Sequence, residues 1–352
     1  MTDMTPAHLR SQRPALSLSF GTTRVAILDS DYILNQVARL VDDPVRAFSL
    51  IGPPFRRGRT FASAHVLSEL YQSDKLGFAN KWEKLAHQAA ERGRSTKPAA
   101  YRQMFEQSFL PRITFVDVGG VFVGAEPARR VHAIDRHDAP TGQLAVLLSR
   151  TRPIVYAHDK SLWRPGLAPA PANFQAVLRA GFQADNSENL TQGFTYVAGG
   201  VIWAVDGAAR GVAGVIKVPR WAPWVAVIGV AAWYLVGKER RDRVVDALRP
   251  VGQLLQREAE ISTNALTTLA DAAAQVEPSD RLECRIAEVL AKLSDDEALT
   301  AAEIHERITG GFDPPRELPS AGDMRAFMRQ LSCFVEGPTS RFRLGHTYET
   351  NQ

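Results

Sequence analysis

The feature of this chain that most constrains its fold is a set of short apolar segments that end in an acidic residue. Residues 25–28 (VAIL) lead into Asp29, and residues 153–158 (PIVYAH) lead into Asp159. A third apolar segment covers residues 113–119. Segments of this length are typical of buried strands, and strands that alternate with helical patterns predict a parallel sheet covered by helices on both faces. We therefore predict an α/β fold.

Helical patterns occupy the intervals between the predicted strands. Residues 32–43 repeat apolar side chains at helical spacing, and Pro44 ends this pattern. Residues 52–60 (GPPFRRGRT) predict a loop that leads into a second helix over residues 61–72, and residues 141–150 predict a short helix. We assign residues 1–20 to a flexible arm and residues 21–175 to the α/β domain.

Four acidic residues are expected to gather at one edge of this sheet. Asp29 and Asp159 end strands, whose carboxyl ends form the site edge of an open parallel sheet. Glu69 lies on the second helix, and Asp138 begins a later one. Crowded carboxylates repel one another unless a cation joins them, and hard oxygen ligands select Mg²⁺ or Mn²⁺. Each aspartate taken singly also fits a turn or a helix cap.

These residues lie in segments that resemble the four motifs of PIN domains. The segments are VAILDSDYIL, SAHVLSELYQ, HDAPTGQLAVLLS and IVYAHDKSLW, in this order within residues 23–165. The resemblance implies that Asp29, Glu69, Asp138 and Asp159 are the catalytic metal ligands. Asp31, Asp135 and Ser161 are the auxiliary residues that we assign beside them. The resemblance to PIN domains also implies a ribonuclease that leaves 5′-phosphate and 3′-hydroxyl ends, as in bacterial toxin–antitoxin pairs.

Two basic segments fit a path for RNA. Arg56, Arg57 and Arg59 belong to the predicted loop before the Glu69 helix, and Arg92, Arg94 and Lys97 belong to a second loop. Such side chains would contact phosphates. An ordinary solvated loop explains either segment equally well. The formal net charge of +4 permits a nucleic-acid partner without requiring one.

The middle of the chain contains an apolar segment bounded by aromatic residues. Residues 221–237 form a run of 17 without a charge, and Lys238, Arg240, Arg241 and Arg243 follow it closely. This pattern predicts a membrane helix, with a buried helix of a soluble domain as the alternative. With residues 196–216 as a first span, we predict an apolar helical hairpin over residues 195–240. Both terminal domains would then lie in the cytoplasm, at the inner face of the cell membrane.

The C-terminal part resembles a winged helix-turn-helix domain over residues 280–348, after a helical linker over residues 241–279. Thr300 and Glu303 predict a capping box at the second helix, residues 323–334 the third helix, and residues 333–345 a β-wing. The arginines at 325, 329, 341 and 343 would contact nucleic acid. Winged helices also bind proteins, so a protein inhibitor is an equal alternative for this domain.

The function that follows is a metal-dependent endoribonuclease, tethered to the membrane lipid and toxin-like or defence-like. The alternative is a catalytically inactive PIN-like scaffold that binds nucleic acid or a protein through its C-terminal domain. We also expect a homo-oligomer. The two cysteines, Cys284 and Cys333, exclude a disulfide framework and a cysteine-based zinc site by their number and spacing.

Overall fold

A computed structural model of the chain describes three main ranges, residues 24–42, 58–184 and 263–348. Within them residues 74–76, 95, 120, 123, 295–296 and 312 are not described, whereas residues 257, 260 and 261 are. The chain divides into two compact units. One unit combines residues 1–181 with residues 268–352, and the other covers residues 182–267. The description below concerns the first unit.

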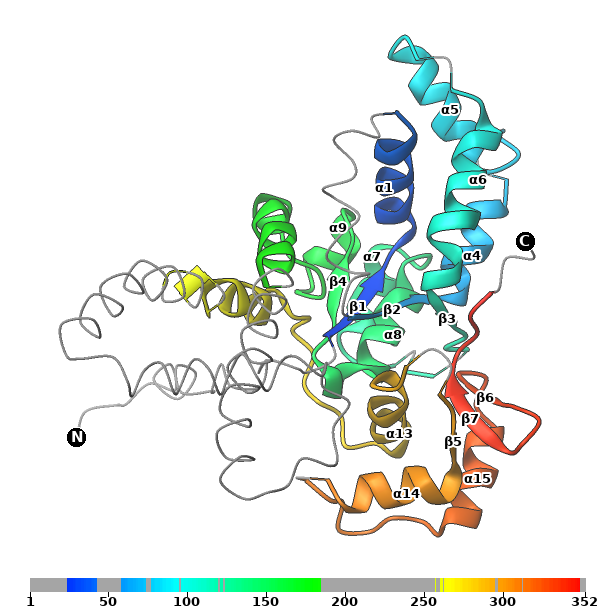
Figure 1. Cartoon of the computed structure of the whole chain (residues 1–352), viewed down its shortest axis with the longest axis vertical. Helices are drawn as coiled ribbons and strands as arrows, with labels where there is room; N and C mark the ends of the chain where they lie inside the picture. Colours follow the sequence, from blue (N-terminus) through cyan, green and yellow to red (C-terminus); the bar gives the residue numbers. More distant parts are fainter. Residues whose placement is uncertain are drawn as a thin grey trace, which may run out of the picture. The chain divides into compact units, whose positions relative to one another are not determined.

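A four-stranded parallel sheet forms the centre of this unit (Figure 1). Its strands are β1 (Arg24–Leu28), β2 (Gly58–Ser63), β3 (Thr114–Val116) and β4 (Ile154–Tyr156), in the order β3-β2-β1-β4. Each neighbouring pair is parallel. The predicted α/β fold with a parallel sheet is therefore confirmed.

Strand β2 corrects the sequence prediction. We predicted a loop through residue 60 and a helix from residue 61, but residues 58–63 form a strand and the helix begins at Ala64. The segment GRTFAS begins with glycine and arginine and has no continuous apolar run, so it shows no strand pattern of its own. It becomes a strand because β1 and β3 pair with it on both sides and its last four residues are buried.

The first set of helices comes from the first half of the chain. They are α1 (Ser30–Asp42), α4 (Ala64–Tyr71), α5 (Lys81–Glu91) and α6 (Pro98–Ser108), with a 3-10 turn, η3 (Leu110–Arg112), before β3. The rings of Tyr32 in α1 and Tyr156 in β4 lie 5.3 Å apart, so α1 packs on the sheet face to which Tyr156 points.

The opposite face carries a second set of helices. These are α7 (Ala128–Ile134), α8 (Ala139–Leu147) and α9 (Lys160–Trp163), with a 3-10 turn, η4 (Ser149–Thr151), after α8. Val25, Ile27 and Val155 belong to the same core cluster as Leu144 and Leu147 of α8. Neighbouring strand residues alternate between faces, which explains why Tyr156 and Val155 meet different helices.

The C-terminal part contains three helices and a small antiparallel sheet. The helices are α13 (Leu282–Ala291), α14 (Ala301–Thr309) and α15 (Ala321–Arg329). The strands β5 (Leu299–Thr300), β6 (Phe334–Glu336) and β7 (Arg341–Leu344) pair in the order β5-β7-β6. The predicted capping box is confirmed, because Thr300 and Glu303 exchange hydrogen bonds at the start of α14.

This C-terminal part shares the core of the α/β part. Cys284, Ile286 and Ala287 of α13 belong to the same buried cluster as Leu144 and Val146 of α8. The C-terminal segment also continues the large sheet at its edge. His346 exchanges two backbone hydrogen bonds of 2.8 Å with Phe115, on the β3 side that β2 leaves open.

Among the described residues, no helix combines the length and apolar character that a membrane span needs. The predicted hairpin over residues 195–240, including the spans at 196–216 and 221–237, lies outside the described residues. So do the predicted arm over residues 1–20 and the first part of the predicted linker, residues 241–256.

Candidate metal centre

Three aspartates meet at the carboxyl edge of the large sheet. Asp29 follows β1 and Asp159 follows β4, and these strands are neighbours. The backbone N–H of Asp29 donates to the carbonyl of Tyr156 at 3.1 Å, which fixes the two strand ends side by side. Asp31 lies in the first turn of α1. One carboxylate oxygen from each of Asp29, Asp31 and Asp159 lies within 4.8 Å of the others.

Asp29 is the most buried member of this triad, with 2% of its surface exposed. Its Oδ1 accepts a hydrogen bond of 2.9 Å from the Thr141 hydroxyl in α8. Its Oδ2 is buried and has no hydrogen-bond partner among the described residues. Burial, followed by the charges of Asp31 and Asp138, raises the pKa of Asp29 well above its ordinary value. A buried carboxylate with a vacant oxygen fits a cation.

Asp31 and Asp159 complete the triad from the more open side. The backbone N–H of His158 donates to Asp31 Oδ2 at 2.8 Å, whereas Asp31 Oδ1 is buried without a partner among the described residues. Burial and the charge of Asp159 raise the pKa of Asp31 to about 6. Asp159 is the most exposed of the three, and partial desolvation of its carboxyl, followed by the charge of Glu69, raises its pKa.

Asp138 lies beside the triad at the start of α8. The Ser161 hydroxyl donates to its Oδ2, so the auxiliary residue predicted at position 161 holds this carboxylate. The Asp138 side chain makes no cap bond to α8, which sets aside the N-cap alternative for its carboxylate. Burial, together with the charges of Asp159 and Asp135, raises the pKa of Asp138 to about 6, although the hydrogen bond from Ser161 acts to lower it.

Glu69 faces the same acids from α4 but is already paired. The Lys81 ammonium contacts Glu69 Oε1 at 2.8 Å. Burial acts to raise the pKa of Glu69, but hydrogen bonds from Lys81 and Ser30, together with the Lys81 charge, lower it below its ordinary value. Glu69 interacts electrostatically with Asp29, Asp138 and Asp159. The structure thus brings all four predicted acids into one region.

The closest group differs from the predicted set in one respect. Asp31, which we expected to be auxiliary, belongs to the triad, whereas Glu69 and Asp138 interact with the triad electrostatically. The signal was present in the sequence, because Asp29 and Asp31 are separated by one residue where a strand turns into a helix. Asp135 is exposed at the end of α7, and its Oδ1 accepts the backbone N–H of His137.

Two groups of contacts escaped the sequence prediction. Thr141 supports Asp29 from α8, and Lys81 neutralises Glu69 from the start of α5. Thr141 stands in a run of small and apolar residues, and Lys81 lies 12 residues beyond Glu69 in a helix whose packing could not be foreseen. Side-chain support of this kind depends on tertiary contacts that leave no local pattern.

The predicted RNA path is changed by the structure. Arg56 and Arg57 lie outside the described residues. Arg59 is a strand residue rather than a loop residue, and it pairs with Val25 near the amino end of β1, opposite the acidic edge. Its guanidinium donates to the Leu293 carbonyl and, at 3.3 Å, to Thr114 Oγ1. Arg59 therefore joins the sheet to the C-terminal part.

The second basic loop lies at the far end of α1. The Arg94 guanidinium contacts Asp42 Oδ2 at 2.5 Å, and the hydroxyls of Thr96 and Tyr101 donate to Asp42 Oδ1. Lys97 and Arg92 are exposed. Asp42 ends α1, whereas the aspartate triad gathers at its start, so this loop is a helix length away from the triad.

Three of the four C-terminal arginines stabilise the C-terminal part itself. Arg325 and Arg329 in α15 both donate to the Glu336 carboxylate in β6. Hydrogen bonds from Arg329 and Arg325 lower the pKa of Glu336 to about 2. Arg341 donates to the Ala298 carbonyl at 2.7 Å. Arg343 is exposed on β7.

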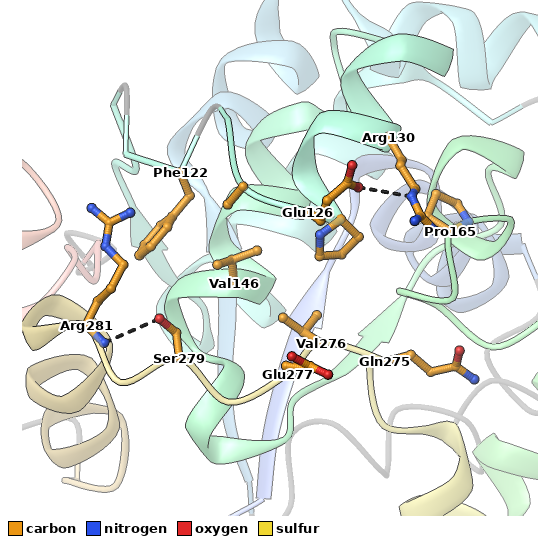
Figure 2. Close-up of a pocket in the computed structure, with 12 residues that line it drawn as sticks. Phe122, Glu126, Arg130, Val146, Pro165, Gln275, Val276, Glu277, Ser279 and Arg281 are labelled. Atoms are coloured by element: carbon orange, nitrogen blue, oxygen red, sulfur yellow. Dashed lines mark hydrogen bonds and ion pairs between the residues drawn. The ribbon is translucent and has the colours of Figure 1, made fainter. Parts of the chain in front are cut away.

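A cleft of about 320 Å³ lies away from the acids, between α8 and the segment that precedes α13 (Figure 2). Its walls include Phe122, Val146 and Val276, and the Arg281 guanidinium lies 4.5 Å from the centre of the Phe122 ring. None of the predicted site residues lines this cleft. Its position marks the junction between the α/β and C-terminal parts.

The acidic edge thus offers several carboxyl oxygens in a region where burial raises carboxyl pKa values, and two of these oxygens are buried without a hydrogen-bond partner in the described part of the chain. The three aspartates could hold a metal ion through their carboxylate oxygens. No family model, curated protein or solved structure matches this chain.

Proposed function

We propose that this chain is a PIN-type, metal-dependent endoribonuclease that hydrolyses RNA phosphodiester bonds. The observation that carries the proposal is the convergence of Asp29, Asp31 and Asp159 at the carboxyl edge of adjacent parallel strands. Asp138 and Glu69 lie in electrostatic contact with them. The choice of RNA as the substrate rests on the resemblance of the four acidic segments to PIN motifs.

The residues divide into ligands and supports. Asp29, Asp31 and Asp159 would hold Mg²⁺ or Mn²⁺, and Glu69 and Asp138 border the same space. A bound divalent ion supplies an activated water at neutral pH and neutralises charge on the leaving oxygen. Thr141 fixes one oxygen of Asp29, so that the other remains available. Ser161 holds Asp138 in the same way.

The raised carboxyl pKa values fit this role. Asp31 and Asp138 have pKa values of about 6 without an ion, because burial and neighbouring acids disfavour the charged forms. A cation favours those charged forms, so ion binding releases protons near neutral pH. We expect ion affinity, and cleavage with it, to rise as the pH increases through about 6.

The wider architecture completes the proposal. We propose that residues 280–348 form a winged-helix-like domain, and that the apolar residues 195–240 tether the protein to the inner face of the membrane. The helices α14 and α15 and the β6–β7 hairpin support the first proposal. The uncharged run over residues 221–237 and the basic residues after it support the second. A toxin-like or defence-like role follows from the same family resemblance.

The test is the cleavage of total RNA by the purified full-length protein in Mn²⁺. Asp29→Asn should lower the rate by at least about a hundredfold, because an amide is a poor substitute for a carboxylate ligand. Asp117→Asn is the matched control. Asp117 also follows a strand of this sheet, but it is exposed and binds the Gly119 N–H, a contact that asparagine keeps.

Two results would contradict the proposal. Equal RNA cleavage by wild type and Asp29→Asn would place the activity elsewhere or in a contaminant. Binding of RNA without cleavage, at any Mn²⁺ concentration, would support the inactive scaffold instead. Wherever the wild type cleaves RNA, the Asp117→Asn variant should cleave it at the same rate.

A further inference from the structure

Helix α8 is buried on every side. Ala139 and residues 141–147 are all buried, although a helix on the surface of an α/β fold normally shows one polar face. Gly142 lies so close to α7 that an added Cβ would meet the Val131 side chain at 3.3 Å. The sheet and α7 cover part of α8, so another element must cover the rest.

The C-terminal part provides that cover. Cys284 Sγ in α13 lies 3.5 Å from the Val146 carbonyl, and the backbone N–H of Ser279 donates to Ser149 Oγ at 3.2 Å. Figure 2 shows Val146 next to the segment that carries Ser279 and Arg281. Contacts to the last turn of α8 and to η4 therefore come from residues 279–284.

Ion pairs hold the same end of α8. The side chain of Arg150, in η4, contacts Glu288 and Asp280 at 2.8 Å and Asp313 at 3.2 Å. Its side chain is 13% exposed and that of Glu288 is 24% exposed, so water screens this ion pair less than it screens surface pairs. The planar guanidinium makes separate contacts with three acids, which a single ammonium could not reproduce.

The other end of α8 carries two residues of the candidate metal centre. Asp138 immediately precedes the helix, and Thr141 in its first turn donates to Asp29. The backbone N–H groups of Thr141 and Gly142 bond to the Asp138 carbonyl at 3.1 and 3.2 Å. A helix of nine residues is about 13 Å long, and a close-packed helix transmits a displacement at one end to the other.

We infer that the C-terminal part positions the metal centre through α8, and that Arg150 with Glu288 is the positioning pair. Residues 280–348 then support the candidate metal centre by packing against α8, whatever else they bind. This inference rests on the proposed function, since it gives the C-terminal part a role in binding the ion. The inference also states that contacts at one end of α8 control the other end, and this part can be tested without an ion.

The experiment compares Glu288→Gln with Glu336→Gln in the full-length protein. Both glutamates bind arginines and are similarly exposed, at 24% and 22%, but Glu336 contacts only α15 and the wing among the described residues. Arg150→Lys is a second variant that keeps the charge. The measurements are hydrogen exchange of residues 139–143 in chelator and Mn²⁺ affinity by calorimetry.

We expect Glu288→Gln and Arg150→Lys to speed exchange at residues 139–143 by about tenfold and to weaken Mn²⁺ binding by about three- to tenfold. Glu336→Gln should change neither. Wild-type exchange at residues 139–143 in Glu288→Gln would overturn the inference, as would faster exchange with unchanged Mn²⁺ affinity. If the wild-type protein binds no Mn²⁺, the proposed function fails, and the exchange data still decide whether the C-terminal part controls α8.

Discussion

Replacing Asp31 with asparagine should stabilise the protein when no divalent ion is present. The pKa of Asp31 is raised from 3.8 to about 6 by burial and by Asp159. One pKa unit corresponds to about 1.4 kcal/mol, so holding this carboxylate charged costs about 3 kcal/mol at most. The asparagine removes that cost but weakens the hydrogen bond from the His158 N–H, by about 1 kcal/mol. The net gain in unfolding free energy is about 1–2 kcal/mol.

The pH dependence follows from the direction of the shift. A raised pKa means that the folded state binds the Asp31 proton more tightly than the unfolded state does. The stabilisation is therefore fully present below the unfolded pKa of 3.8 and is lost as the pH rises through about 6. Asp31→Asn should exceed the wild type in stability at pH 7.5 and lose this advantage at pH 4.5, where Asp31 is largely protonated in the wild type.

Thermal unfolding in chelator at these two pH values provides the assay. A gain of 1–2 kcal/mol corresponds to a rise in Tm of about 2–8 °C for a unit of this size. Adding Mn²⁺ should reverse the order, because only the wild type keeps all three carboxylates. Asp117→Asn controls for the loss of a charge. A lower Tm for Asp31→Asn in chelator at pH 7.5 would show that Asp31 is a structural cap and would refute the reasoning.

Two further substitutions test the supports of the site and of the fold. Thr141→Val removes the hydroxyl that donates to Asp29 and keeps the side-chain shape. We expect the Mn²⁺ affinity, measured by calorimetry, to fall about tenfold. An unchanged affinity would contradict this expectation. Gly345→Ala would place a Cβ 2.4 Å from the Phe115 carbonyl oxygen at a φ of +70°, so we expect a loss of about 1–3 kcal/mol in urea unfolding. Gly322→Ala, whose nearest contact is 3.8 Å away, should be neutral, and equal losses for the two variants would contradict the clash.

The parallel sheet was predictable where a strand carried its own apolar run. The strands at 25–28 and 154–156 consist of Val, Ile, Leu, Ala and Tyr, which bury well on both faces of a sheet. Strand β2 was not predictable in this way. Its sequence GRTFAS begins with glycine and arginine, and its strand character comes from pairing with β1 and β3. Pairing partners distant in the sequence leave no local pattern.

The candidate site, like the sheet, was predictable only in part. The ends of parallel strands meet at one edge, so Asp29 and Asp159 were expected together, and their approach is confirmed. The closest group of three carboxylates contains Asp31 and not Glu69, because a strand-to-helix turn directs residues 29 and 31 to the same side. The pairing of Glu69 with Lys81 depends on how α4 meets α5, which the sequence does not specify.

The sequence of α8 already contained the evidence that a second layer covers it. Residues 139–147 (APTGQLAVL) have no charged residue and no polar stripe, so a helix there cannot face water on one side. In an α/β fold the outer face of such a helix needs a partner, and α13 buries it with Cys284, Ile286 and Ala287. The C-terminal part is therefore bound to the α/β part by the same apolar surface that fixes α8. An activity that depends on Asp138 and Thr141 then requires both parts, however far apart they lie in the sequence.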